Sequence, residues 1–316
     1  MEERILLSTY VIKIIDGNKN NQYLSNFNGS DDFLKLFDKF SNYIFENINQ
    51  LKDKSGRNTI HLTLEEKPIL NDEKRYLYGF FSSGIGGEKY RVKDITTNTT
   101  VLNVNKNHAA FRDVFFYLYI PKNKSIGYLI LQRKNSFGIK TKLSPALNAY
   151  ISKEGFLDYY ISINNIVHHS VYRKMMDFGK LKKVELVKRK IPNNLEDYVN
   201  NNENYQETKG TFRTSFSSRS SLPEHWKEYI DKLLKKEKNE TVEIEGLDEN
   251  FSDLEFQLDL NGKQKTFYVK NQQRTQPDID VTANIIFVDD SPTVESLIQQ
   301  SQELINDLIE IRPKNV

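Results

Sequence analysis

The chain has 316 residues, of which 38% are hydrophobic and 12% aromatic, a content that excludes a disordered protein. It contains no cysteine, which excludes disulfides, thiolate metal sites and cysteine nucleophiles. The formal net charge is only +2, but this average conceals a strong segregation of charge along the sequence. No apolar run approaches the roughly 20 residues that cross a bilayer, and the first residues are acidic where a signal peptide is basic. We therefore expect no membrane insertion and a cytoplasmic location.

Strand patterns dominate the first part of the sequence. Residues 4–15 are rich in β-branched side chains and predict a strand, while residues 30–48 carry apolar side chains at helical spacing and predict a helix capped by Ser30. Further strands are predicted at hairpin-like spacing, with a glycine turn at 84–87, over 58–66, 74–83, 88–95, 113–121 and 125–134. An antiparallel meander covered by the helix is expected.

Strands and helices alternate after residue 134. A short helix is predicted over 144–154 with Ser144 as its cap, followed by a strand over 156–164, a helix over 165–178 and a strand over 180–191. The C-terminal part predicts a helix over 221–238, a hairpin with the turn Asn261-Gly262, a strand over 283–290 and a closing helix over 291–311.

These patterns predict an α+β protein. Its N-terminal domain, residues 1–190, would be strand-rich and mostly antiparallel, with a mixed α/β extension and a basic second half. Residues 191–220 are polar without apolar periodicity and predict a linker or mobile loop. Residues 221–316 would form a small acidic α/β domain.

Charge is concentrated in two regions. Between Val114 and Lys190 there are 15 Lys and Arg against four acids, and between Glu240 and the C-terminus there are 16 acids against six bases. A basic region favours a polyanionic partner because bound Lys and Arg release counterions from phosphates. Alternatively, the basic and acidic regions pair within one chain, between copies, or with a partner protein.

The predicted nucleic-acid surface, for DNA or RNA, comes from the basic middle. Phe137, with Tyr172, is available in this prediction to stack on a base. The expected binding residues are Arg133, Lys134, Phe137, Lys140, Lys142, Arg173, Lys174, Lys182, Lys183, Lys188 and Arg189.

Patterns for catalysis are weak. His168 and His169 are adjacent, so on a helix they point in different directions and do not chelate one metal. Glu65 and Lys67, with Asp53 upstream, have the strand spacing of a metal-dependent nuclease, which remains an alternative. We expect no metal site, no cofactor and a non-catalytic protein.

The segment "GYLILQRKNSFGIKTKLSPALNAYI", Gly127 to Ile151, resembles proteins of bacterial phage-defence islands, including the accessory subunit of the Kiwa type. The resemblance is one of pattern and transfers no catalytic residue. It implies a cytosolic bacterial defence role with nucleic acid as a partner.

Overall fold

The computed structural model describes residues 4–52, 59–134, 137–165, 169–190, 209–235, 242–244, 247–251, 253–269 and 278–310. The chain forms two compact units. Unit 1 comprises Met1–Ile166 and Ile285–Asn306, and unit 2 comprises Val167–Asn284 and Asp307–Val316. Both combine helices with antiparallel strands, which confirms the predicted strand-rich α+β class. Within the described residues, no helix is long and apolar enough to span a bilayer.

Unit 1 is built on an antiparallel sheet with the strand order β10-β1-β9-β8-β5-β3-β2, and β4 shares one edge of β5 with β3. Strand β9 lies at the centre and is buried on both faces, which explains its continuous run of apolar residues. The elements of this unit are β1 (Leu6–Asp16), α1 (Phe33–Glu46), β2 (Asn49–Lys52), β3 (Thr59–Leu64), β4 (Ile69–Asn71), β5 (Tyr76–Gly86), β6 (Tyr90–Lys93), β7 (Thr100–Val104), β8 (Ala109–Tyr119), β9 (Gly127–Arg133), α2 (Lys140–Lys153), β10 (Tyr159–Asn165), β18 (Phe287–Val288), β19 (Ser291–Pro292) and α6 (Val294–Glu310), which leaves the unit after Asn306.

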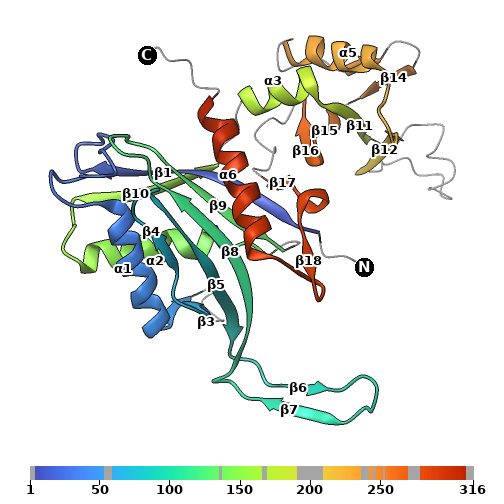
Figure 1. Ribbon diagram of the computed structural model, residues 1–316. Helices are drawn as coiled ribbons and strands as arrows, with labels where there is room; N and C mark the ends of the chain where they lie inside the picture. The colour runs from blue at the N-terminus through green and yellow to red at the C-terminus, as the bar shows by residue number, and fades with distance from the viewer. Residues whose placement is uncertain are drawn as a thin grey trace. The chain divides into compact units, whose positions relative to one another are not determined.

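Helices cover both faces of this sheet (Figure 1). Helices α1 and α2 pack on one face, where Phe37 and Leu143 share a core with Leu118 of β8. Tyr117, the preceding residue of β8, points to the opposite face, where its hydroxyl accepts a hydrogen bond of 3.3 Å from Gln302 Nε2 of α6. Unit 1 therefore has three layers, and the central sheet is enclosed between helices.

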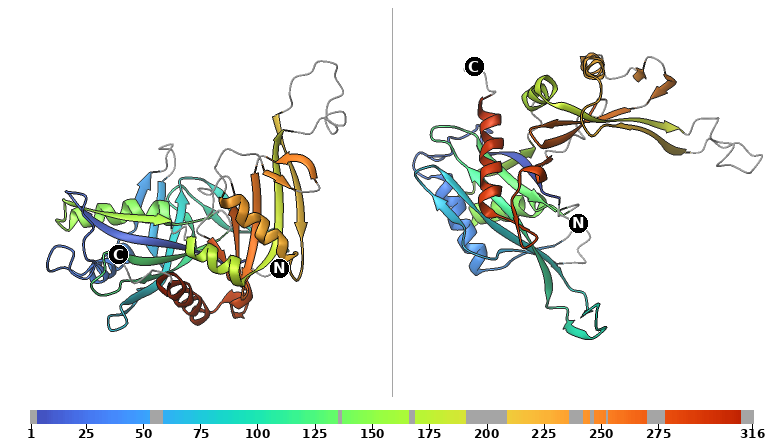
Figure 2. Two further views of the ribbon diagram at one scale, coloured as in Figure 1. Left: turned by 90° about the horizontal axis from the view of Figure 1, so that it is seen from above. Right: turned by 45° about the vertical axis from the view of Figure 1, so that its right-hand side comes forward.

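One part of unit 1 extends beyond the helix layers. Strands β5 and β8 pair along eleven residues each, and the chain between them continues as the two-stranded ribbon β6–β7, which projects from the end of the sheet (Figure 2). The glycine turn expected at residues 84–87 is wrong, because β5 continues through Gly86. Gly84 is needed there for close pairing, since a Cβ would lie 2.6 Å from the Ala110 carbonyl oxygen.

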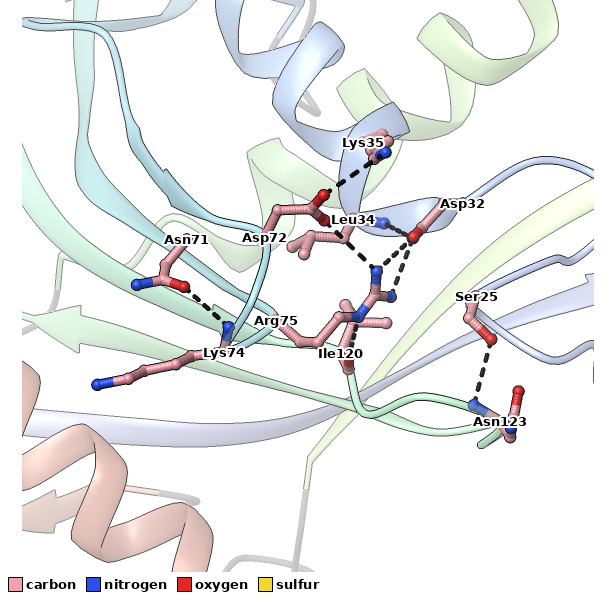
Figure 3. A network of polar contacts seen from close by, with 10 residues as sticks. All are labelled: Ser25, Asp32, Leu34, Lys35, Asn71, Asp72, Lys74, Arg75, Ile120 and Asn123. Atoms are coloured by element: carbon pink, nitrogen blue, oxygen red, sulfur yellow. Dashed lines mark hydrogen bonds and ion pairs between the residues drawn. The ribbon is translucent and has the colours of Figure 1, made fainter.

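A buried ion pair fixes the start of α1 (Figure 3). Asp32, not Ser30, is the N-cap, and its carboxylate accepts a hydrogen bond of 2.9 Å from the Leu34 backbone N–H. The guanidinium of Arg75 binds both oxygens of that carboxylate and also donates to the Ile120 carbonyl at 3.0 Å. Arg75 therefore connects the N-cap of α1, the β4–β5 turn and the end of β8.

Unit 2 contains an antiparallel sheet with the order β12-β11-β15-β16-β17. Tyr172 of α3 and Ile230 of α5 pack with Val184 and Phe256 on one face of this sheet. The predicted hairpin turn is confirmed, because Asn261 and Gly262 both have the positive φ that a type I′ turn requires. The elements are α3 (His169–Phe178), β11 (Lys180–Lys190), β12 (Lys209–Ser217), α5 (Glu224–Lys235), β13 (Val242–Ile244), β14 (Leu247–Phe251), β15 (Asp253–Leu260), β16 (Lys263–Tyr268), β17 (Asp278–Asp280) and the 3-10 helix η2 (Thr282–Asn284).

The division of the chain differs from the predicted domains 1–190 and 221–316. Strand β11 belongs to unit 2 because it pairs with β12 on one side and β15 on the other, and α6 returns to unit 1. Part of the predicted linker, residues 209–217, is strand β12, while residues 191–208 lie outside the described part. Strand β11 therefore lies inside the sheet of unit 2 and is not an edge strand.

Two local predictions are also wrong. Helix α2 begins at Lys140 and contains Pro145, so Ser144 is not its cap. The predicted strand over 283–290 is mostly replaced by η2 and the two-residue strand β18. A short apolar run does not by itself identify a strand, because its conformation depends on whether a pairing partner lies beside it.

Candidate functional site: a basic cluster at the start of helix α2

Two cations, Arg112 of β8 and Lys142 of α2, contact the Phe137 ring, and three more lie within four residues of Phe137 along the chain. We name this group the Phe137 cluster; it contains Arg112 of β8, Arg133 and Lys134 at the end of β9, Phe137, and Lys140 and Lys142 of α2. Of the predicted binding residues, the structure places Lys142 on the Phe137 ring and pairs the Lys134 and Phe137 backbones, whereas Lys140 contacts Tyr10. The structure also adds Arg112, which the sequence analysis missed because it lies outside the basic window, next to Asp113.

A tight turn produces this arrangement. Lys134 and Phe137 form an isolated antiparallel bridge, with backbone hydrogen bonds of 3.1 and 2.9 Å between them. The turn reverses the chain at the end of β9, so α2 starts beside the strand that precedes it. A Cβ added at Gly138 would meet no atom within 4 Å. Lys134 is therefore held next to Phe137, just before helix α2 begins.

The Phe137 ring holds two of these cations. Lys142 Nζ lies 4.1 Å from the ring centroid, and the Arg112 guanidinium lies 5.6 Å from it. The ring also packs against the main core of unit 1. The prediction that Phe137 stacks on a base is therefore not supported by its position, because the ring is already in contact with core residues and cations.

Two lysines of the cluster are partly withdrawn from water. Burial lowers the pKa of Lys140 and of Lys142, and no neighbouring carboxylate raises either pKa. Lys140 Nζ donates to Asn165 Oδ1 at 2.8 Å and lies 5.1 Å from the centroid of the Tyr10 ring. Among the described residues, neither ammonium group has an acidic partner. Keeping these partly buried ammonium groups charged therefore costs free energy, and a bound anion would lower that cost.

The N-terminus of helix α2 adds to the positive electrostatic potential around these lysines. The first turn of α2 contains no acid, and Ile139 at its N-cap position makes no side-chain capping bond. A helix N-terminus carries partial positive charge, so cations in its first turn are unfavourable unless an anion is bound there. On the same side of the sheet, Ser83 lies directly opposite Arg112, and within the described residues its buried hydroxyl has no hydrogen-bond partner. The site is suited to bind a phosphate group.

The other predicted binding residues lie in unit 2, and three of them bind acids there. Arg173 pairs with Asp231 at 3.1 Å, Lys174 with Asp307 at 2.7 Å, and Lys183 with Glu185 at 2.6 Å. The hydrogen bonds from Lys183 and then Arg213 lower the pKa of Glu185, which therefore remains ionised. These cations are paired with acids within unit 2, but only Asp307 belongs to the acidic region after Glu240, so the predicted pairing of the basic and acidic regions stays a prediction.

The other three predicted residues of unit 2, Lys182, Lys188 and Arg189, lie on strand β11. Lys182 Nζ donates to the Arg219 carbonyl at 2.6 Å, and Lys188 is half-buried on β11. The side chain of Arg189 lies outside the described part. Tyr172, proposed to stack on a base, is only 8% exposed and belongs to the core of unit 2.

The nuclease alternative gains no support from the geometry. Strand β3 ends at Leu64, so Glu65 and Lys67 follow the strand and do not share its face. Lys67 Nζ lies 5.9 Å from the Phe45 ring centroid, and Asp53 lies outside the described residues. Over the described ranges, no group of three or more histidine and acidic residues is placed to hold a metal ion. Compared with known proteins, the chain matches no family model and no curated sequence.

Proposed function

We propose that this protein is a nucleic-acid-binding subunit whose Phe137 cluster contacts the phosphate backbone. The observation that supports this most is the pair Lys140 and Lys142, which are half-buried at a helix N-terminus without an acidic partner among the described residues. Arg112 contacts the same Phe137 ring as Lys142, and Arg133 ends the neighbouring strand β9. A phosphodiester backbone supplies repeated anions for such a set of cations.

The proposal is narrower than the sequence prediction. Only the cations of unit 1 take part, since those of unit 2 are largely engaged with acids of the same unit. The role is binding, with no catalytic group assigned. The resemblance of residues 127–151 to phage-defence proteins supports a bacterial defence system as the setting, and the cytosol as the location.

The test is a salt titration of nucleic-acid binding by fluorescence anisotropy, with short duplex DNA, single-stranded DNA and RNA. The variant carries Lys140→Gln and Lys142→Gln, which remove two charges without placing new acids in the site. Each phosphate contact contributes about −0.9 to the slope of log K against log salt. We expect weaker binding and a slope reduced in magnitude by about 2.

The matched control carries Lys122→Gln and Lys124→Gln. These two lysines belong to the same unit and the same basic window, but they are exposed at the turn before β9, away from Arg133. We expect the control to bind like the original protein. Equal losses of affinity in both variants would show that binding depends on net charge and not on the Phe137 cluster. If the original protein binds no nucleic acid at low salt, the proposed function is refuted.

A further inference from the structure

The ribbon β6–β7 is an ordered arm whose residues are exposed over most of its length. All four residues of β6 are exposed, as are the first four of β7. Ladder bonds and a β-bulge at Val101 fix the register, with Arg91 opposite Asn103 and Val92 opposite Leu102. The arm is therefore a defined structural element, and its side chains are presented to solvent.

The two faces of the arm differ in chemistry. Side chains alternate along a strand, so Arg91 and Lys93 share one face, which is basic and polar. Tyr90, Val92 and Leu102 share the other face and are 42–52% exposed. Such a small apolar set is well short of the roughly 20–30 residues that a standard protein interface uses on each side. Charge complementarity thus favours a polyanion over a second copy of the chain.

The tip of the arm presents one isoleucine. Asp94 accepts hydrogen bonds from the backbone N–H groups of Thr96 and Thr97, at 2.7 and 2.9 Å, and Lys93 Nζ donates to Asn98 Oδ1 at 2.9 Å. These bonds hold the turn, and within it the Ile95 side chain is 99% exposed. A large apolar side chain at the tip of a ribbon that carries Arg91 and Lys93 has the chemistry of a wedge that enters between stacked bases.

The arm starts at the Phe137 cluster. Strand β9 runs antiparallel to β8, so Arg133 lies near the beginning of β8, where Arg112 belongs to the cluster. The ribbon leaves the sheet at this same end, beyond the pair Gly86 and Ala109 (Figure 2). Arg112 and the base of the arm therefore lie at the same end of the sheet.

We propose that the arm inserts into a groove of duplex DNA, with Arg91 and Lys93 on phosphates and Ile95 as a wedge at a base step. This inference rests on the proposed function and assigns it a substrate class. The major groove of B-form DNA admits a two-stranded ribbon, and some ribbon proteins use the minor groove, whereas the major groove of A-form RNA is deep and narrow. Partial unstacking by an inserted side chain bends the duplex.

The experiment measures duplex affinity and bending together, using short DNA duplexes labelled at both ends for energy transfer. The variant is Ile95→Ser, which removes the wedge without disturbing the core because the side chain is exposed. Its matched control is Val101→Ser, which changes another exposed apolar residue of the arm, 67% exposed and away from the tip. We expect Ile95→Ser to lose the bend and about tenfold in duplex affinity, while binding to single strands is unchanged and the control behaves like the original protein.

A second variant, Arg91→Gln with Lys93→Gln, should reduce the magnitude of the salt slope for duplex DNA by about 2. If the protein binds nucleic acid through the Phe137 cluster but Ile95→Ser binds and bends the duplex like the original protein, insertion of the arm is refuted and the proposed function is retained. It is also overturned if Ile95→Ser converts a dimer to a monomer by light scattering, because the arm then binds a second copy. Absence of all nucleic-acid binding would refute the proposed function first.

Discussion

The ion pair between Arg75 and Asp32 provides the strictest test of the packing in unit 1 (Figure 3). The Arg75 side chain is 8% exposed and that of Asp32 is 18% exposed. Asp32 is also the N-cap of α1, and Arg75 also binds the Ile120 carbonyl. Removing the carboxylate therefore leaves the buried guanidinium with the longer and more exposed ion pair to Asp72, at 3.9 Å, and leaves the helix without its cap.

The magnitude follows from these two losses. Breaking a buried ion pair from one side costs about 3–5 kcal/mol, and the residual exposure of Asp32 favours the lower limit, about 3 kcal/mol. Losing an N-cap costs about 1 kcal/mol. We therefore expect Asp32→Ala to lower the free energy of unfolding by about 4 kcal/mol. Asp32→Asn should lower it by about 3 kcal/mol, because the amide oxygen still accepts from the Leu34 N–H.

The assay is equilibrium unfolding in urea, which does not screen charges. Far-ultraviolet circular dichroism follows both units, tyrosine fluorescence comes mainly from unit 1, which holds 12 of the 17 tyrosines and no tryptophan, and Trp226 gives a separate signal from unit 2. A double-mutant cycle with Asp32→Asn and Arg75→Met isolates the interaction between the two side chains. A coupling free energy below about 0.5 kcal/mol would refute the reasoning, because contacting residues of this kind couple more strongly.

The backbone of Arg75 allows an independent comparison. Its φ of 62° lies in the left-handed region, where a non-glycine residue is disfavoured by about 1–2 kcal/mol. Arg75→Gly and Arg75→Ala both remove the guanidinium, but only glycine removes this strain. Urea unfolding should therefore show Arg75→Gly to be more stable than Arg75→Ala by about 1 kcal/mol. Equal stabilities would contradict the strained conformation.

Two further predictions concern unit 2. Burial lowers the pKa of Lys265 from 10.5 to about 8, so between pH 8 and 10.5 the unfolded chain binds the proton that the folded chain has released, and stability rises with pH. At about 1.4 kcal/mol for each pH unit, the free energy of unfolding rises by at most about 3 kcal/mol. Lys265→Met should abolish this rise in urea titrations. If the pH profile of the variant is unchanged, the rise does not come from Lys265. Gly179→Ala should cost about 1–3 kcal/mol in thermal or urea unfolding, because the new Cβ meets the carbonyl oxygens of Met175 and Asp259, whereas Gly138→Ala, in open space, should change stability by no more than about 0.5 kcal/mol.

The candidate site was only partly predictable. The basic residues after β9 are visible in the sequence because they follow each other within ten positions. Arg112 is not, because it joins them only through the pairing of β8 with β9 and the position of the Phe137 ring. The sequence predicted Arg173 and Lys183 as binding residues in the same way as Lys142. In the structure, Arg173 pairs with Asp231 and Lys183 with Glu185, and these ion pairs distinguish the two residues from Lys142.

The sequence alone determined the local structure: the α+β class, most strands and helices, and the Asn261-Gly262 turn. Such features depend on side-chain periodicity and backbone preferences over a few neighbouring residues. The tertiary structure decided which sheet β11 joins, that α6 returns to unit 1, and which lysines keep their charge without an acidic partner among the described residues. A strand carries the same alternating pattern whichever partner it finds, so burial and pairing between distant segments make these choices.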